Sequence, residues 1–249
     1  MPKLELSVIT ERLEAIEETI VFKLIDRAQY RVNAVIYEPG KSGFEGCFDK
    51  SLFELRVRLH EEMDAQFGRF CVPEERPFTR GLPAPRRKVL LPESQLRIDS
   101  YDTINLTADI TVAYRLLVER LCAPGDDGQY GSSVEHDVYA LQAIARRVHF
   151  GSLYIAECKF RGDPARFAAL AAARDEDGLL AELTRKEIEE RIIDRVRNKT
   201  DGLQSMVNTK IRRAIDPLLI VDFYRRCIIP LTKKGEVRYL LNRKNDHGI

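Results

Sequence analysis

Basic side chains lie on predicted helices at positions where a hydrophobic core does not need them. Arg146 and Arg147 fall among apolar neighbours in the middle of one helix, and Lys159 falls near its far end. A guanidinium in such surroundings is costly to bury unless an anion meets it. The pattern therefore indicates a site for an anionic group, although one solvated and one structural arginine would give the same sequence.

Two further pairs share a predicted helix face. Arg185 and Glu189 lie four residues apart, as do Thr232 and Glu236, and side chains at that spacing are neighbours on a helix. Such a pair is often only a surface ion pair that contributes about 0.3–0.5 kcal/mol. These residues are candidates for a polar site, and their spacing alone does not identify a reaction.

Charge and cysteine usage limit the function classes. The 249 residues carry 40 Lys and Arg against 39 Asp and Glu, a formal net charge of +1. No field of one sign exists to hold nucleic acid or a membrane surface, so any anion-binding site must be local. No apolar run approaches the roughly 18 residues that span a bilayer. The scattered cysteines and histidines form no metal motif, and we expect reduced thiols in a cytoplasmic protein.

Apolar residues recur at steps of three and four, which predicts an all-α fold. No segment alternates with the period of two that is typical of a strand. The length suits one sizeable core, so we expect a single multi-helix domain over residues 1–249. The predicted helices cover residues 7–35, 51–70, 104–121, 133–160 and 163–174, and two more begin near residues 184 and 216.

Local signals mark several boundaries. Five prolines within residues 72–102 predict a long connector inside the domain. Pro230 predicts a kink in the last helix. Capping boxes predict helix starts at Ser51, Ser132 and Thr184, and Asp-Pro pairs predict starts at Asp163 and Asp216.

Four separated motifs carry a family resemblance. They occupy residues 20–27, 130–133, 144–160 and 229–241. In this order they resemble the first helix, the effector-site turn, the long active-site helix and the last helix of the all-helical chorismate mutases of eukaryotic (fungal and plant) type. The resemblance implies a cytoplasmic homodimer built from long helices. It also implies an isomerase that needs no cofactor and no metal.

The same resemblance implies the reaction and the residue roles. Chorismate is rearranged to prephenate by a Claisen-type 3,3-sigmatropic shift, in phenylalanine and tyrosine biosynthesis. Arg147 would hold a substrate carboxylate, and Lys159 would donate to the ether oxygen. Glu236, as a protonated carboxyl, would meet the same oxygen. Glu189 would accept from the ring hydroxyl, and Thr232 would contact the other carboxylate region.

Two substrate-facing positions depart from the family. Thr10 stands where the family has an arginine, and Arg12 lies about 200° further round the helix, so it cannot replace that arginine. Arg185 stands one turn before Glu189, where the family has a small polar residue. We expect Arg185 either to take over a carboxylate or to select a different substrate.

A third departure is an insertion. The family separates its helix arginine and lysine by eleven residues, whereas Arg147 and Lys159 are twelve apart. A regular helix would then place the two side chains about 120° apart. Because one inserted residue is usually absorbed as a π-bulge, we predict a bulge between Gly151 and Ala156.

The regulatory pocket of the family is matched in part. Arg69, Gly131 and Ser132 match its site for tyrosine or tryptophan, whereas Gly68 replaces one arginine and Glu135 replaces a hydroxyl residue. A carboxylate at Glu135 would repel the carboxylate of an amino-acid effector.

Two alternatives to a chorismate mutase remain open. One is a related pericyclic enzyme that acts on isochorismate, because Thr10 and Arg185 both change the carboxylate-reading side of the pocket. The other is a catalytically weakened homologue that acts as a ligand-binding or regulatory protein. Lys159 and Glu236 are both present, which favours an enzyme.

Overall fold

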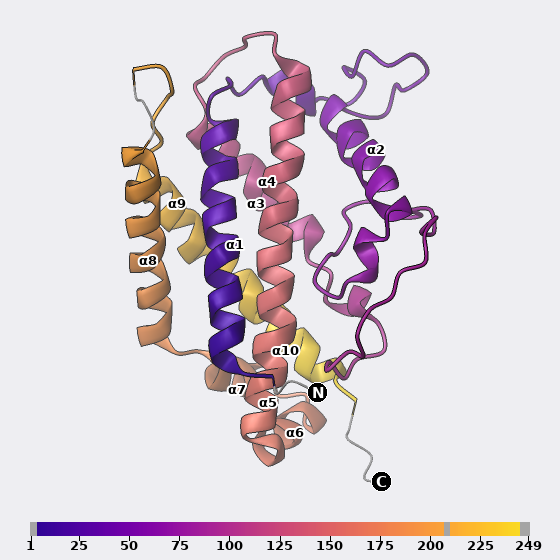
Figure 1. Cartoon of the computed structure of the whole chain (residues 1–249), viewed down its shortest axis with the longest axis vertical. Helices are drawn as coiled ribbons and strands as arrows, with labels where there is room; N and C mark the ends of the chain where they lie inside the picture. The colour runs from indigo at the N-terminus through magenta and orange to yellow at the C-terminus, as the bar shows by residue number, and fades with distance from the viewer. Residues whose placement is uncertain (1–3, 207–209, 245–249) are drawn as a thin grey trace.

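The computed structural model describes residues 4–206 and 210–244 (Figure 1). Every regular element in these ranges is helical, and the β-bridge between Arg31 and Ala123 stands alone there. The predicted all-α class is confirmed. No helix in the described ranges is long and apolar enough to cross a membrane.

The helices vary widely in length. The α-helices are α1 (Leu6–Arg27), α2 (Leu52–Gln66), α3 (Thr107–Leu121), α4 (Tyr130–Phe150), α5 (Ala156–Gly162), α6 (Pro164–Ala172), α7 (Glu176–Leu183), α8 (Lys186–Ser205), α9 (Pro217–Phe223) and α10 (Ile229–Asn242). The other turns are 3-10 helices η1 (Ala34–Tyr37), η2 (Arg69–Cys71) and η3 (Tyr101–Ile104), and π-helices η4 (Gly151–Ile155) and η5 (Tyr224–Ile228).

Long helices are arranged side by side around α1. In Figure 1, α1 lies between α4 and α8, α2 leans outward beyond α4, and α9 and α10 run diagonally behind. The buried side of α1 carries apolar residues at helical spacing, including Ile16, Ile20 and Leu24. They belong to the larger hydrophobic cluster, and a second cluster around Leu153 and Tyr239 fills the end near α5 to α7.

The long helix that carries Arg147 and Lys159 contains the predicted bulge. α4 continues through the π-helical turn η4, Gly151–Ile155, directly into α5. A π turn holds one residue more than an α turn. The predicted π-bulge is therefore confirmed at the predicted position.

The π turn η4 packs closely against α10. Gly235 of α10 has no room for a β-carbon, because that atom would collide with the side chain of Ser152. The Ser152 hydroxyl lies 3.1 Å from the carbonyl oxygen of Thr232. Two glycines allow this approach, since a β-carbon on Gly151 would lie 2.8 Å from Cγ2 of Thr232.

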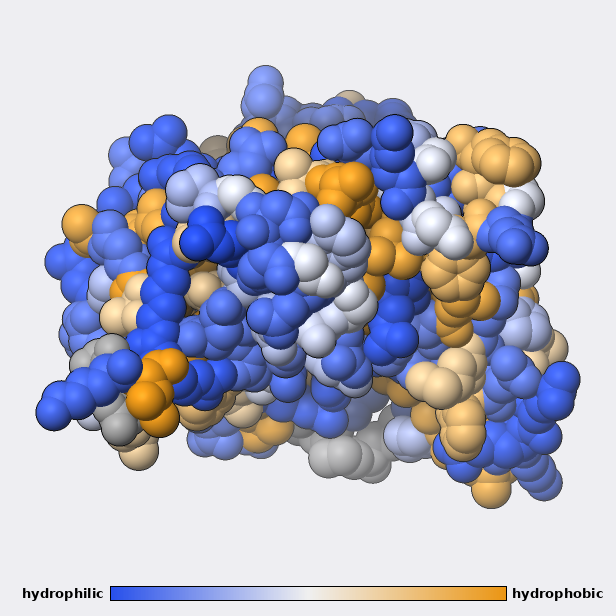
Figure 2. All heavy atoms as spheres, turned by 90° about the horizontal axis from the view of Figure 1, so that it is seen from above, coloured by the Kyte–Doolittle hydropathy of each residue, from blue (hydrophilic) through white to orange (hydrophobic). Residues whose placement is uncertain are grey.

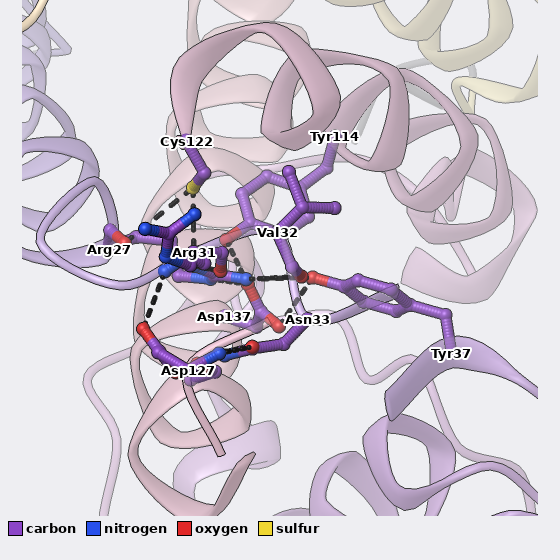
Figure 3. A network of polar contacts seen from close by, with 10 residues as sticks. Arg27, Arg31, Val32, Asn33, Tyr37, Tyr114, Cys122, Asp127 and Asp137 are labelled. Carbon is purple, nitrogen blue, oxygen red and sulfur yellow. Dashed lines mark hydrogen bonds and ion pairs between the residues drawn. The ribbon is translucent and has the colours of Figure 1, made fainter. Parts of the chain in front are cut away.

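α1 ends earlier than the predicted Val35, and a buried polar network explains why (Figure 3). The Nε atom of Arg27 donates to Asp137 at 2.6 Å, and its Nη1 and Nη2 atoms donate to the carbonyls of Arg31 and Val32. A continuing helix would direct those carbonyls to amides four residues on. The arginine therefore folds the chain back at the end of α1.

Two predicted capping boxes do not form. α4 begins at Tyr130, two residues before Ser132, without a side-chain cap. α8 has Arg185 at its N-cap, again without a side-chain cap. The Thr184 hydroxyl is engaged elsewhere, because it donates to the carbonyl of Leu180 at 2.7 Å.

The other starts predicted from capping residues are correct, whereas α3 begins at Thr107 and not at the predicted residue 104. Ser51 forms the full capping box, and Asp163 and Asp216 accept backbone N–H groups ahead of Pro-containing first turns. The sequence did not predict α7, which is short and capped by Asp175. Near Pro230, where the sequence predicts a kink, the helix contains the π turn η5, which ends two residues earlier.

The connector over residues 72–102 is held down by buried side chains. The carboxylate of Glu61 accepts the backbone N–H groups of Phe78 and Thr79 at 2.8 and 2.7 Å. Arg76 is buried and donates to the carbonyls of Phe70 and Val72. The first part of the segment, residues 72–79, is irregular but packed, whereas most of residues 80–94 are exposed.

Candidate active site

A cavity of about 420 Å³ opens between α1, α5, α8 and α10. All seven residues that the sequence placed next to substrate line it: Thr10, Arg147, Lys159, Arg185, Glu189, Thr232 and Glu236. They come from segments far apart in the sequence. The structure therefore brings the candidates together, and their individual roles remain predictions.

Arg147 forms the buried wall of the cavity. Its side chain is almost fully buried, and its Nη2 atom lies 3.4 Å from Oε1 of Glu17. Its Nε atom is buried without a hydrogen-bond partner in the described part of the chain. Arg146, its neighbour, is instead directed outward and pairs with Glu75 at 3.3 Å. One arginine is thus enclosed in the cavity wall, whereas the other is partly exposed and pairs with a carboxylate outside the cavity.

Glu17 is a site residue that sequence reasoning missed. It is fully buried and accepts from Nε and Nη2 of Arg195 at 2.8 and 2.9 Å as well as from Arg147. A signal was present, because Glu17 falls within the apolar stripe of α1 next to Ile16 and Ile20. A carboxylate in that position needs cations from neighbouring helices. Arg195 and Arg147 supply them, and Glu17 in turn fixes the position of the Arg147 guanidinium.

Lys159 and Glu236 meet across the cavity. The Nζ atom of Lys159 donates to Oε2 of Glu236 at 3.2 Å and to the carbonyl oxygen of Leu183 at 2.8 Å. The π turn η4 between residues 151 and 155 gives Lys159 this orientation despite the insertion. An ammonium donor and a carboxyl group are thereby held next to each other at the cavity surface.

Burial raises the pKa of Glu236 above its ordinary value. Desolvation is the largest cause, and the ammonium of Lys159 opposes it, followed by more distant cations. The carboxyl is 5% exposed, so desolvation outweighs the single close cation. The environment favours the protonated form more than water would, and a protonated carboxyl can donate a hydrogen bond.

The hydroxyl and carboxylate candidates nearby already have partners. Oε1 of Glu189 lies 2.5 Å from Nζ of Lys233, a second cation that the sequence did not single out. The hydroxyls of Thr10 and Thr232 donate to carbonyls one turn earlier in their own helices, both at 2.8 Å. Arg12 does not line the cavity, and its guanidinium lies over the ring of Phe150.

The three effector candidates are not brought together within one chain. Arg69 pairs with Asp64 and Glu75 and donates to Gln142 at 2.6 Å. Gln142 lies eleven residues after Gly131 in α4, which is about 16 Å along a helix. Gly131 and Ser132 lie in the first turn of α4. A single copy of the chain therefore does not contain an assembled effector pocket.

The described part of the chain holds no group of His, Cys, Asp and Glu side chains arranged to bind a metal. The cavity therefore offers cations, hydroxyls and carboxyl groups as its chemistry. These groups suit a ligand with several oxygen atoms and negative charge.

Known proteins similar to this chain are chorismate mutases, although no family model matches the chain. Chorismate mutase 1, chloroplastic, of Petunia hybrida is 37% identical over 238 residues, covering 91% of this chain and 72% of that protein. Chorismate mutase of Schizosaccharomyces pombe is 35% identical over 251 residues, covering 97% of each.

Solved structures agree with these sequence relatives. Aro7p chorismate mutase from Candida albicans in complex with L-Trp superimposes with a TM-score of 0.90 and 31% identity, covering 99% of this chain and 94% of that one. AtCM1 with phenylalanine in its allosteric site gives a TM-score of 0.83 and 37% identity, covering 94% of each.

Proposed function

The chain belongs to the chorismate mutases of plants and fungi, and from this membership we propose that the cavity between α1, α5, α8 and α10 is its active site. The protein is accordingly an isomerase that rearranges chorismate to prephenate. The observation that carries the assignment is the Lys159–Glu236 contact of 3.2 Å beside the buried Arg147. It places two potential donors and a carboxylate-binding cation within one cavity.

The chemistry explains why these groups suffice. The rearrangement breaks a C–O bond and forms a C–C bond in one step, without a covalent intermediate. The ether oxygen of the substrate gains negative charge as its bond to carbon lengthens. Catalysis then depends on holding the chair-like conformer and on donors aimed at the developing charge.

Each side chain has a role in this scheme. Arg147, fixed by Glu17, holds one substrate carboxylate. Lys159 donates to the ether oxygen, and protonated Glu236 donates to the same oxygen from the other side. Glu189 accepts from the ring hydroxyl, and Thr232 borders the second carboxylate region.

The first test follows the loss of the diene absorbance of chorismate, with prephenate measured after acid conversion to phenylpyruvate. We expect turnover by the wild type and a fall of about 100- to 1,000-fold in kcat/KM for Glu236→Ala and Arg147→Ala, the usual cost of removing one preorganised donor. Arg146→Ala is the matched control, because this arginine points outward and should keep its activity. Turnover of isochorismate but not chorismate would favour the related pericyclic enzyme. Absence of both reactions in a folded protein would favour the binding-protein alternative.

We also propose a homodimer formed through α2. Leu59 and Met63 of α2 and its C-cap residue Phe67 follow one another at four-residue spacing and are 51%, 49% and 68% exposed. Figure 2 shows hydrophobic side chains gathered on that side of the molecule, over α2 and the segment before it. An apolar stripe of this kind on a helix is suited to a symmetric contact with a second copy.

Light scattering during gel filtration tests the dimer. Leu59→Glu should convert a dimer to a monomer, because it introduces two charges into an apolar contact. Val112→Glu on α3 is the control, since Val112 is also exposed, at 64%, but lies off the stripe. A monomeric wild type, or a dimer that survives Leu59→Glu, would contradict the proposal.

An amino-acid effector is the further part of this proposal. The relatives above bind L-Trp, or phenylalanine in an allosteric site, and a second copy of the chain would be needed to bring Gly131 and Ser132 near Arg69. Glu135 weakens such a site, although Arg56 lies 3.4 Å from its carboxylate and partly offsets the charge. Activity measured with and without tyrosine or tryptophan tests this, and Glu135→Thr should increase the response to either.

We propose a cytoplasmic location as well. All five cysteines lie in the described part of the chain and are free, which suits a reducing compartment. Fractionation of cells that express the tagged protein tests this.

A further inference from the structure

Arg185 is the cation of the cavity for which the described part of the chain offers no partner. It lies at the N-cap of α8, its side chain is exposed, and it lines the cavity beside Glu189. Among the residues that the structure describes, no carboxylate and no carbonyl contacts its guanidinium. A positive side chain at a helix N-terminus is also electrostatically unfavourable, because the N–H groups there carry partial positive charge. An unpaired arginine in this place is therefore suited to receive an anion.

The other cations in the cavity are already engaged. Six Lys and Arg side chains and three Glu side chains line it in the described part of the chain. Lys233 is held by Glu189 at 2.5 Å, and Lys159 by Glu236 at 3.2 Å. Arg195 is held by Glu14 at 3.0 Å and by the buried Glu17.

Arg147 and Arg191 complete the set of six. Arg147 is the buried wall, with one unpartnered nitrogen, and the proposed function already assigns it one substrate carboxylate. Arg191 donates from Nε to the carbonyl oxygen of Glu187, in its own helix, at 3.3 Å. Arg185 alone among the six has neither an acidic nor a backbone partner within the described ranges.

A substrate with two carboxylates needs a second cation. Both carboxylates keep their charge throughout the rearrangement, so the cation that holds the second one binds the ground state and the transition state alike. Thr10, which also lines the cavity, brings no charge, and its hydroxyl is bonded to the carbonyl of Leu6. Arg185, at the N-cap of α8, is the cavity cation left to supply this charge within the described ranges.

We propose that Arg185 is the second carboxylate clamp of this enzyme and so sets its preference for ring-bearing dicarboxylates over monocarboxylates. The proposal rests on the proposed function, because that function supplies the dicarboxylate and the role of Arg147. Arg185 and Arg147 then each hold one carboxylate of the substrate, in the cavity that also contains the Lys159–Glu236 pair. No bond to the protein forms or breaks.

The test compares Arg185→Ala and Arg185→Lys with Lys186→Ala. Lys186 is the adjacent exposed cation and does not line the cavity, so Lys186→Ala removes the same charge from the same helix end. Arg185→Ala should raise the KM for chorismate about 10- to 100-fold, the usual effect of losing a hydrogen bond between charged groups. It should leave kcat nearly unchanged, because uniform binding is lost. Arg185→Lys should recover part of the loss, since it keeps the charge but not the two-pronged geometry.

A binding measurement without turnover separates this proposal from the proposed function. Calorimetry gives the affinity of each variant for an unreactive bicyclic ether dicarboxylate and for its monomethyl ester. The wild type should prefer the diacid, and Arg185→Ala should lose that preference while Lys186→Ala retains it. Equal KM values for Arg185→Ala and Lys186→Ala, or an unchanged diacid preference in Arg185→Ala, would overturn the clamp. A wild type that turns over no chorismate would instead refute the proposed function.

Discussion

The π turn η4 is the feature whose removal gives the sharpest prediction. Arg147 and Lys159 are twelve residues apart, and at about 100° per residue a regular helix would rotate one about 120° from the other. Eleven residues give a rotation of about 20°. The π turn absorbs the extra residue, so deletion of one residue from it should convert it to an α turn and leave both side chains facing the cavity.

Tyr154 is the residue to delete. It is half-buried within η4 and stacks on Phe150, with a ring-centroid distance of 4.5 Å. We expect the deletion variant to keep kcat/KM within about tenfold of the wild type, because the catalytic register survives. Tyr154→Ala is the matched control, since it removes the same side chain but retains the bulge.

The opposite change should abolish activity. One alanine inserted between Ile155 and Ala156 adds a further rotation of about 100° to α5, which turns Lys159 away from Glu236. Loss of that donor should lower kcat by about 100- to 1,000-fold. Chorismate turnover and circular dichroism would be measured for all three variants. A folded deletion variant as inactive as the insertion variant, with Tyr154→Ala active, would refute the rotational argument.

Three further predictions concern buried groups. The pKa of Glu236 is raised from 4.5 by burial, so kcat/KM should fall as pH rises through the raised pKa, and Glu236→Gln should remove that step from the pH–rate profile. The Glu236 carboxyl also binds its proton more tightly in the folded protein than in the unfolded chain. The free energy of unfolding should therefore decrease as pH rises from about 4.5 to the pKa of Glu236 in the folded protein. Asp137→Ala removes the carboxylate partner of the buried Arg27 and should lower the free energy of unfolding, measured in urea titrations, by about 3–5 kcal/mol. Glu62→Ala, which breaks an exposed pair, should change the free energy of unfolding by less than about 1 kcal/mol. Gly235→Ala forces a methyl group onto Ser152 and should lower the melting temperature and activity together, and an unchanged melting temperature would contradict the close approach of η4 and α10.

Periodicity and capping predicted most of the fold. The stripe of α1, the Ser51 box and the Asp-Pro starts depend on interactions within a few residues, and such local signals can be read from the sequence. The end of α1 could not be, because it depends on Arg27 meeting Asp137, 110 residues away in the chain. α7 was missed for a different reason, since eight residues are too few to show a clear helical period.

The candidate site divides in the same way. The motifs predicted which residues line the cavity, and the count of residues between Arg147 and Lys159 predicted the bulge. The partners Glu17, Arg195 and Lys233 were missed, because each pairs with a residue on another helix. Glu17 left one sequence signal, an acid within an apolar stripe, whereas Arg195 and Lys233 left none.

Two π turns orient Lys159 and Glu236 toward each other. Lys159 follows η4, and Glu236 follows η5, so each side chain lies after a turn that contains one extra residue. Pro230 cannot donate a backbone hydrogen bond, and a wide turn just before it accommodates that loss. Since one residue more or less rotates the following helix by about 100°, each of the two side chains keeps its direction only when its own π turn is present or its own helix is shortened by one residue. The insertion between Arg147 and Lys159 is therefore compatible with catalysis, because the π turn absorbs the added residue before Lys159. The side chain of Lys159 still lines the cavity.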